Sequence, residues 1–186
     1  MKSGTSEQAN PQILTDSIFW ECIQLAQNSK GAHQRYGSVI VKDGKIVGRG
    51  YNRAIAHPSF GKLVRPIYQG YSNHAEVEAI CDALMNGANI ADSSLYVAGY
   101  FPKLGDLLIL KRRFDFICDR CPPIIRRYPI LTVNLPTSMG WISQRNDQNF
   151  WEAERVNKKR AGSRLEQRVA SVQGRFTLAD LQEANS

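Results

Sequence analysis

The chain has 186 residues, of which 42% are hydrophobic and 22% are charged, and its formal net charge is +7. This composition is that of an ordinary globular protein, and no stretch approaches the ~18 apolar residues of a transmembrane helix, so we expect no membrane partner. The polar first twelve residues lack the apolar core of a secretory signal. We therefore expect a cytoplasmic protein whose four cysteines are reduced and available to a metal.

Apolar periodicity predicts elements in the order helix, hairpin, helix, strand, helix, strand. In chain order they are a helix at 18–26, strands at 38–41 and 45–50 around the turn Asp43-Gly44, a helix at 75–85, a strand at 95–98, a short helix at 122–127 and a strand at 130–135. A long loop is expected over residues 53–73. The order predicts an α/β fold with a mixed sheet covered by helices.

The domain boundaries follow from composition. Residues 1–13 are rich in Ser, Gln and Asn and are predicted to be a mobile tail. The domain itself is expected over residues 14–142. Residues 143–186 are charged and helix-prone, which predicts a helical extension.

The positive charge is concentrated in one segment. Residues 111–127 carry six Lys or Arg against two Asp or Glu, which is +4 of the total +7. Such a segment attracts phosphate, on a free nucleotide or along a nucleic acid, although a basic surface also serves solubility alone.

Two short motifs have the residue types of a catalytic zinc site. They are His74-Ala75-Glu76 and Cys118-Asp119-Arg120-Cys121. One imidazole and two thiolates make a three-ligand zinc site whose fourth position stays open. Glu76 lies two residues after the histidine and is expected to exchange a proton with a water in that position without ligating the metal.

In these motifs the sequence resembles the zinc-dependent cytidine/deoxycytidylate deaminase superfamily, which has H-x-E followed by C-x-x-C. The resemblance covers residues 15–142 and implies a cytidine-deaminase-like, three-layer fold. It implies Zn²⁺ bound by His74, Cys118 and Cys121, with Glu76 as the proton shuttle. It also implies that Asn52, in the Gly-Tyr-Asn turn, holds the sugar of the substrate.

The resemblance implies hydrolytic deamination of cytosine to uracil on a free nucleotide or nucleoside, most like the deoxycytidylate deaminases, and a homo-oligomer. Two features depart from the family pattern. Ile117 stands where the family has proline before the first cysteine, and residues 102–116 form an insertion.

Other interpretations remain open from the sequence. The basic segment 111–127 would suit a deaminase acting on single-stranded DNA or RNA, or an inactive zinc-containing domain that binds nucleic acid. The cysteine pair could instead be a redox pair, or part of a structural zinc site completed by His57. Cys22 and Cys81 are expected in the core. Glu78 is expected either on the helix surface or next to the site.

Overall fold

The computed structural model describes residues 12–53, 73–109, 121–147 and 176–186. Its elements are η1 (Gln12–Thr15), α1 (Ser17–Gln27), β1 (Arg35–Lys42), β2 (Lys45–Tyr51), α3 (Ala75–Met85), β3 (Ser94–Tyr100), α4 (Pro122–Ile125), β4 (Thr132–Thr137), β5 (Gly140–Arg145) and α7 (Leu178–Ala184). No helix within these residues is long and apolar enough to cross a membrane.

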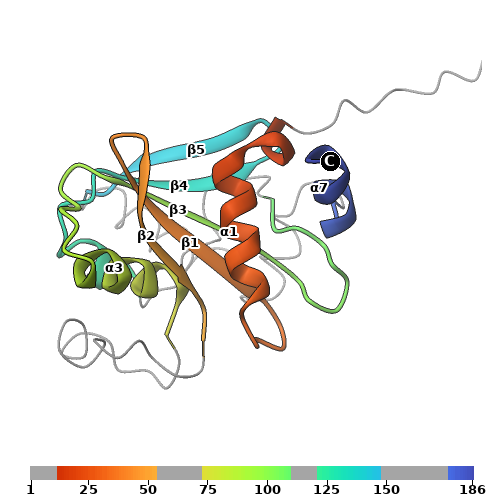
Figure 1. The fold of residues 1–186 in the computed structure, drawn as a ribbon, viewed down its shortest axis with the longest axis horizontal. Helices are drawn as coiled ribbons and strands as arrows, with labels where there is room; N and C mark the ends of the chain where they lie inside the picture. Colours follow the sequence, from red (N-terminus) through yellow and green to blue (C-terminus); the bar gives the residue numbers. More distant parts are fainter. Residues whose placement is uncertain (1–11, 54–72, 110–120, 148–175) are drawn as a thin grey trace, which may run out of the picture.

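The strands form one mixed sheet in the order β2-β1-β3-β4-β5 (Figure 1). Only β3 and β4 pair in parallel, and α4 lies in the connection between them. The other neighbours are antiparallel. The predicted hairpin is β1–β2, with positive φ at both Asp43 (50°) and Gly44 (73°), as a tight two-residue turn requires.

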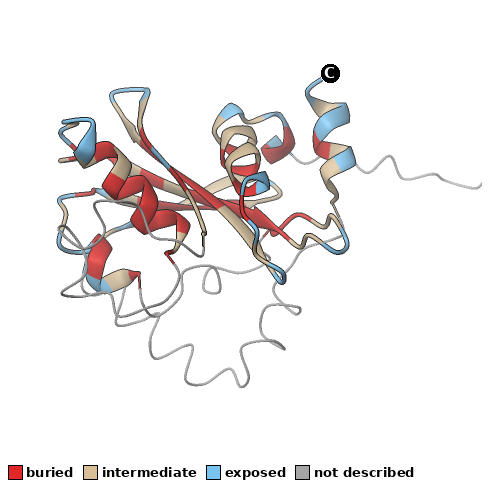
Figure 2. Ribbon diagram, turned by 60° about the horizontal axis from the view of Figure 1, so that its bottom comes forward, coloured by how far each residue is buried: buried red, intermediate tan, exposed pale blue. Residues whose placement is uncertain are grey.

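Helices cover both faces of this sheet. Successive strand residues point to opposite faces, and in β1 Val39 packs in the cluster that includes the buried face of α1, whereas Ile40 packs with α3 and α4. Figure 2 shows buried residues concentrated along α3 and the central strands. The predicted α/β architecture of helix, mixed sheet and helix layers is therefore confirmed.

Helix α3 lies very close to β2 because both surfaces are made of small residues. Ala75, Ala79 and Ala83 recur every fourth residue and face Gly48 and Gly50. A Cβ added at Gly50 would lie 2.3 Å from both the Ala75 carbonyl oxygen and the Ala79 nitrogen. The two glycines thus set the distance at which the start of α3 lies from the sheet.

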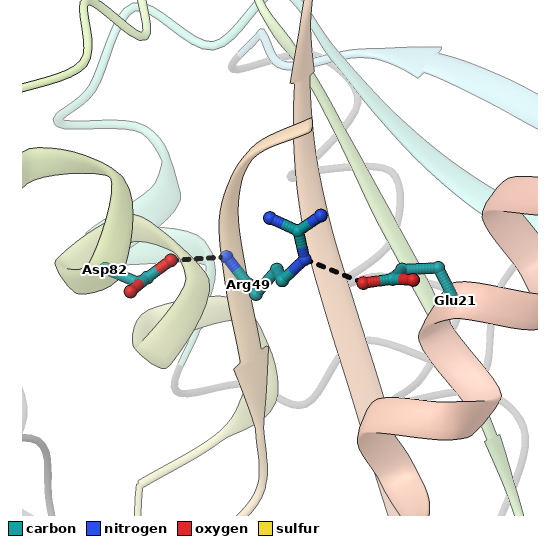
Figure 3. A network of polar contacts seen from close by, with 3 residues as sticks. All are labelled: Glu21, Arg49 and Asp82. Atoms are coloured by element: carbon teal, nitrogen blue, oxygen red, sulfur yellow. Dashed lines mark hydrogen bonds and ion pairs between the residues drawn. The ribbon is translucent and has the colours of Figure 1, made fainter. Parts of the chain in front are cut away.

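One residue of β2, Arg49, links the helices on the two faces through its backbone and its side chain. The Arg49 backbone N–H donates to Asp82 Oδ2 of α3 at 2.9 Å, and Arg49 Nε donates to Glu21 Oε1 of α1 at 2.7 Å (Figure 3). The ion pair is largely exposed, so it adds little to stability. It does fix the direction in which the Arg49 side chain leaves the strand.

Both chain ends contribute more to the fold than composition suggests. Ile13, assigned from sequence to the tail, is fully buried in η1. Strand β5 continues to Arg145, beyond residue 142 where the domain was expected to end. In α7, Leu181 is buried in the same cluster as Ile13, and Asn185 Nδ2 donates to the Leu14 carbonyl at 2.8 Å. The rest of the predicted tail, and most of the predicted extension, lie outside the described residues.

We expect Gly50→Ala to lower the free energy of unfolding by about 1–3 kcal/mol or more, because its methyl group overlaps the backbone of α3. Gly44→Asn is the matched control, since Gly44 has open space around it and Asn tolerates the left-handed conformation. Its cost should stay below about 1 kcal/mol. Urea unfolding measures both. Equal stability of Gly50→Ala and wild type would contradict this contact.

Candidate metal centre and active site

Helix α3 begins at the first of the two predicted motifs. His74 is the N-cap residue, with the extended backbone (φ −92°, ψ 156°) that this position requires, but its side chain makes no capping hydrogen bond. Glu76 and Glu78 lie in the first turn, where carboxylates interact favourably with the helix dipole. The imidazole is therefore not used to cap α3 and points to another partner.

That partner is Cys121, at the start of α4. His74 Nδ1 lies 3.3 Å from Cys121 Sγ. Cys121 is the N-cap of α4, and Pro122, which has no backbone N–H to satisfy, occupies the first helical position. Donor atoms of His74, Glu76 and Cys121 all lie within 4.8 Å of one another. Cys121 is fully buried and Glu76 is 4% exposed, so the cluster is largely shielded from solvent.

The spacing of these donors fits zinc. With bond lengths of about 2.0–2.1 Å to nitrogen and about 2.3 Å to sulfur, tetrahedral zinc holds such ligands roughly 3.5 Å apart. The observed distance between His74 Nδ1 and Cys121 Sγ is 3.3 Å. Imidazole and thiolate are also the donors that zinc prefers. His74 and Cys121 can therefore share a zinc ion without rearrangement of the two helix ends.

Two of the cysteines have a different environment. Cys22 and Cys81 are fully buried in the two core clusters, as expected from the sequence. Burial raises the pKa of the Cys81 thiol to about 12, with a further contribution from the Glu78 carboxylate, and burial raises the pKa of Cys22 above its usual range. Both thiols stay protonated at neutral pH, so they are poor metal ligands.

The other predicted site residues are placed unequally. Cys118 lies outside the described residues, as do His57 and most of the basic segment. Asn52 follows β2 directly, and its side chain holds the beginning of β1. Its Oδ1 accepts from the Tyr36 N–H at 2.7 Å, and its Nδ2 donates to the Gln34 carbonyl at 3.2 Å.

The structure adds three polar residues beside the site that the motifs do not include. Glu78 is 3% exposed and accepts from Arg53 Nε at 3.0 Å and from Asn73 Nδ2. Glu78 therefore lies inside, not on the helix surface. Glu78 is four residues after His74, which puts both on the same side of α3, and this spacing was the sequence signal that could have placed Glu78 beside the site. Its burial could not be predicted in this way, because it depends on the contacts with Arg53 and Asn73.

The fold and this cluster define an α/β protein that presents histidine, cysteine and a carboxylate at the starts of two helices packed on a mixed sheet. Comparison with known families gives the same result from sequence. The profile of the cytidine and deoxycytidylate deaminase zinc-binding region matches residues 15–133. The chain belongs to this family.

Similar solved structures include the deoxycytidylate (dCMP) deaminase of the cyanophage S-TIM5 in its apo form, with 16% identity and a TM-score of 0.42 over 66% of this chain and 81% of that one. The cytidine deaminase of Burkholderia pseudomallei has 15% identity and a TM-score of 0.45, over 69% and 90% of the respective chains. No curated protein matches the sequence significantly.

We expect Asn52→Ala to lower the free energy of unfolding by about 1–3 kcal/mol, because two hydrogen bonds are lost, one to the backbone of β1 at Tyr36 and one to the backbone of Gln34, just before β1. Asn86→Ala is the control: its exposed amide makes one weak 3.3 Å bond to Asp82, and its effect should stay within about 0.5 kcal/mol. Chemical denaturation measures both. If Asn52→Ala matched the control, its side chain would not be fastening the two strands.

Proposed function

We propose that this protein is a zinc-dependent hydrolytic deaminase that converts cytosine to uracil on a free nucleotide or nucleoside. The observation that carries the proposal is the meeting of His74, Cys121 and the buried Glu76 within 4.8 Å, at the starts of two helices. The family match supports it independently, since it covers both motifs up to residue 133.

In this proposal His74, Cys118 and Cys121 hold the zinc ion. When bound, zinc acts as a Lewis acid and makes water nucleophilic near neutral pH. The starts of α3 and α4 hold the His74 imidazole and the Cys121 thiolate at a fixed distance from each other. The close contact of α3 with β2 fixes the position of the helix that carries the imidazole.

Glu76 is the proposed proton carrier. Its carboxylate accepts a proton from the attacking water, whose oxygen bonds to C4 of the base. Glu76 then gives that proton to ring nitrogen N3, takes a second proton from the new C4 hydroxyl and passes it to the amino group. The C4–N bond breaks, ammonia leaves and the C4 oxygen becomes the carbonyl of uracil. The burial of Glu76 suits this role, because a carboxylate shielded from bulk water exchanges its proton with the bound substrate and not with the solvent.

Asn52 is the proposed contact to the sugar. Its amide nitrogen has two hydrogens, and among the described residues one of them is donated, to the Gln34 carbonyl; the second is proposed to donate to a sugar hydroxyl. The same proposal places the protein in nucleotide metabolism in the cytoplasm, as a homo-oligomer. Support for a reducing compartment comes from Cys22 and Cys81, which form no disulfide in the described part of the chain.

Cys121→Ser should reduce bound zinc from about one ion per chain to a small fraction and lower the melting temperature, because metal binding contributes to folding. Cys81→Ala is a matched control, since Cys81 is equally buried in the same core cluster but does not approach His74. It should keep its zinc despite some loss of stability. Metal analysis after extensive dialysis distinguishes the two. Stoichiometric zinc in Cys121→Ser would remove Cys121 from the ligand set.

Glu76→Gln should keep its zinc and lose turnover by a factor of ~10²–10⁴, because the amide cannot accept the proton. Activity is measured by mass spectrometry, as the amino-to-oxo change on cytosine and adenine nucleosides, nucleotides and single-stranded oligonucleotides. Glu183→Gln, an exposed carboxylate on α7, serves as the control and should not change turnover. Near-normal turnover by Glu76→Gln would contradict the mechanism, and loss of zinc would make Glu76 a ligand.

A further inference from the structure

A backbone bridge lies immediately before the candidate metal ligand His74. Arg53 N donates to the Asn73 carbonyl at 3.1 Å, and Asn73 N donates to the Arg53 carbonyl at 2.9 Å. Because Asn73 is fully buried, this bridge fixes the backbone of Arg53 at the entrance of α3. The Arg53 side chain is thus attached to the same rigid point as the imidazole.

A buried carboxylate then orients the guanidinium. Glu78 Oε2 accepts from Arg53 Nε at 3.0 Å, while Glu78 Oε1 accepts from Asn73 Nδ2. The side chain of Glu78 is 4% exposed and that of Arg53 is 31% exposed. One end of the ion pair is therefore inside the protein and the other reaches solvent. Since the buried charge is paired, the site costs less than an isolated charge would.

The guanidinium of Arg53 packs against an aromatic ring, and its two outer nitrogens make no hydrogen bond within the described part of the chain. The guanidinium carbon lies 5.0 Å from the centre of the Tyr51 ring, which restricts the plane of the group. Among the described residues, the guanidinium has one hydrogen-bonding partner, Glu78, and it is reached through Nε. Nη1 and Nη2 therefore form an oriented, partly exposed pair of donors.

We propose that Arg53 binds the phosphate of a nucleotide substrate and makes the enzyme prefer nucleotides to nucleosides. This inference rests on the proposed deaminase function. Two parallel N–H donors match two oxygens of a phosphate, and the charge strengthens both bonds. Glu78 follows His74 by about one turn of α3, roughly 6 Å along the helix axis. Arg53, which is bonded to Glu78, therefore lies beside the proposed metal ligand His74 and the proton carrier Glu76 without taking their position.

Binding of inorganic phosphate and of deoxycytidine 5′-monophosphate to the zinc-loaded full chain is measured by calorimetry. Arg53→Met combined with Glu78→Gln removes the guanidinium without leaving a buried charge unpaired, and should weaken binding of the monophosphate about tenfold to a hundredfold. Glu78→Gln alone keeps the guanidinium and an amide oxygen that can still accept from Arg53 Nε, so it should bind the monophosphate more tightly than the double variant does. Arg53→Lys, which keeps the charge but not the paired donors, should fall between them.

Arg49→Met is the matched control, because Arg49, in the strand that precedes Arg53, is also paired through Nε, but with Glu21 of α1 (Figure 3) and not with a residue of α3. It should bind the monophosphate like wild type. In turnover, the ratio of kcat/KM for the monophosphate to that for deoxycytidine should fall about tenfold to a hundredfold in the Arg53 double variant. Circular dichroism verifies that each variant is folded.

Monophosphate binding equal to wild type in both the folded double variant and Arg53→Lys would overturn the inference. Binding of a short oligodeoxycytidine without terminal phosphates is measured in the same way. If the Arg53 double variant lost binding of this oligonucleotide but kept binding of the monophosphate, Arg53 would contact a phosphodiester and the inference would also be overturned. The calorimetric result does not need turnover. If the wild-type protein deaminates nothing on the substrate panel but the Arg53 variants lose phosphate binding, the phosphate site is supported and the deaminase function is rejected. If the wild-type protein is active but the Arg53 variants bind phosphate as it does, the deaminase function is supported and the phosphate site is rejected.

Discussion

The close contact of α3 with β2 is the constraint on which the site depends. Gly50 has no side chain, so the backbone of Ala75 and Ala79 can lie directly against the strand. The helix cannot move toward the sheet, and the stripe of alanines leaves no long side chain to hold it farther away. His74 and Glu76 belong to the first residues of that helix, so their position is determined by backbone packing instead of by flexible side chains.

Much of this arrangement could be predicted because it depends on local sequence. Asp43-Gly44 permits the two positive φ angles of a tight hairpin, and the periodic residues of α3 end where Asn86-Gly87 begins. The association of His74 with Cys121 could be predicted because few other chemistries need those side chains in that order. Each of these inferences uses a preference that is present within a few residues of the chain.

The parts that could not be predicted depend on contacts between distant segments. By composition Ile13 belongs to a polar tail, but in the structure it packs in the same core cluster as Leu181, near the other end of the chain. Strand β5 has no strict alternation of buried and exposed residues, and it is recognised by its pairing with β4 across the turn at Gly140. Glu78 has the sequence context of a surface carboxylate, and only Arg53 and Asn73 make its burial favourable.

The hydrogen bond from the Arg49 backbone to Asp82 also affects how copies of this protein can meet. Within the described residues, strand β2 is at the edge of the sheet and pairs with β1 alone, so alternate N–H groups on its outer side face away from the sheet, where a strand from another molecule could pair. Asp82 occupies one of these donors, and the charged Arg49 side chain projects from the same position. Continuation of the sheet from one molecule into the next is therefore disfavoured at this edge.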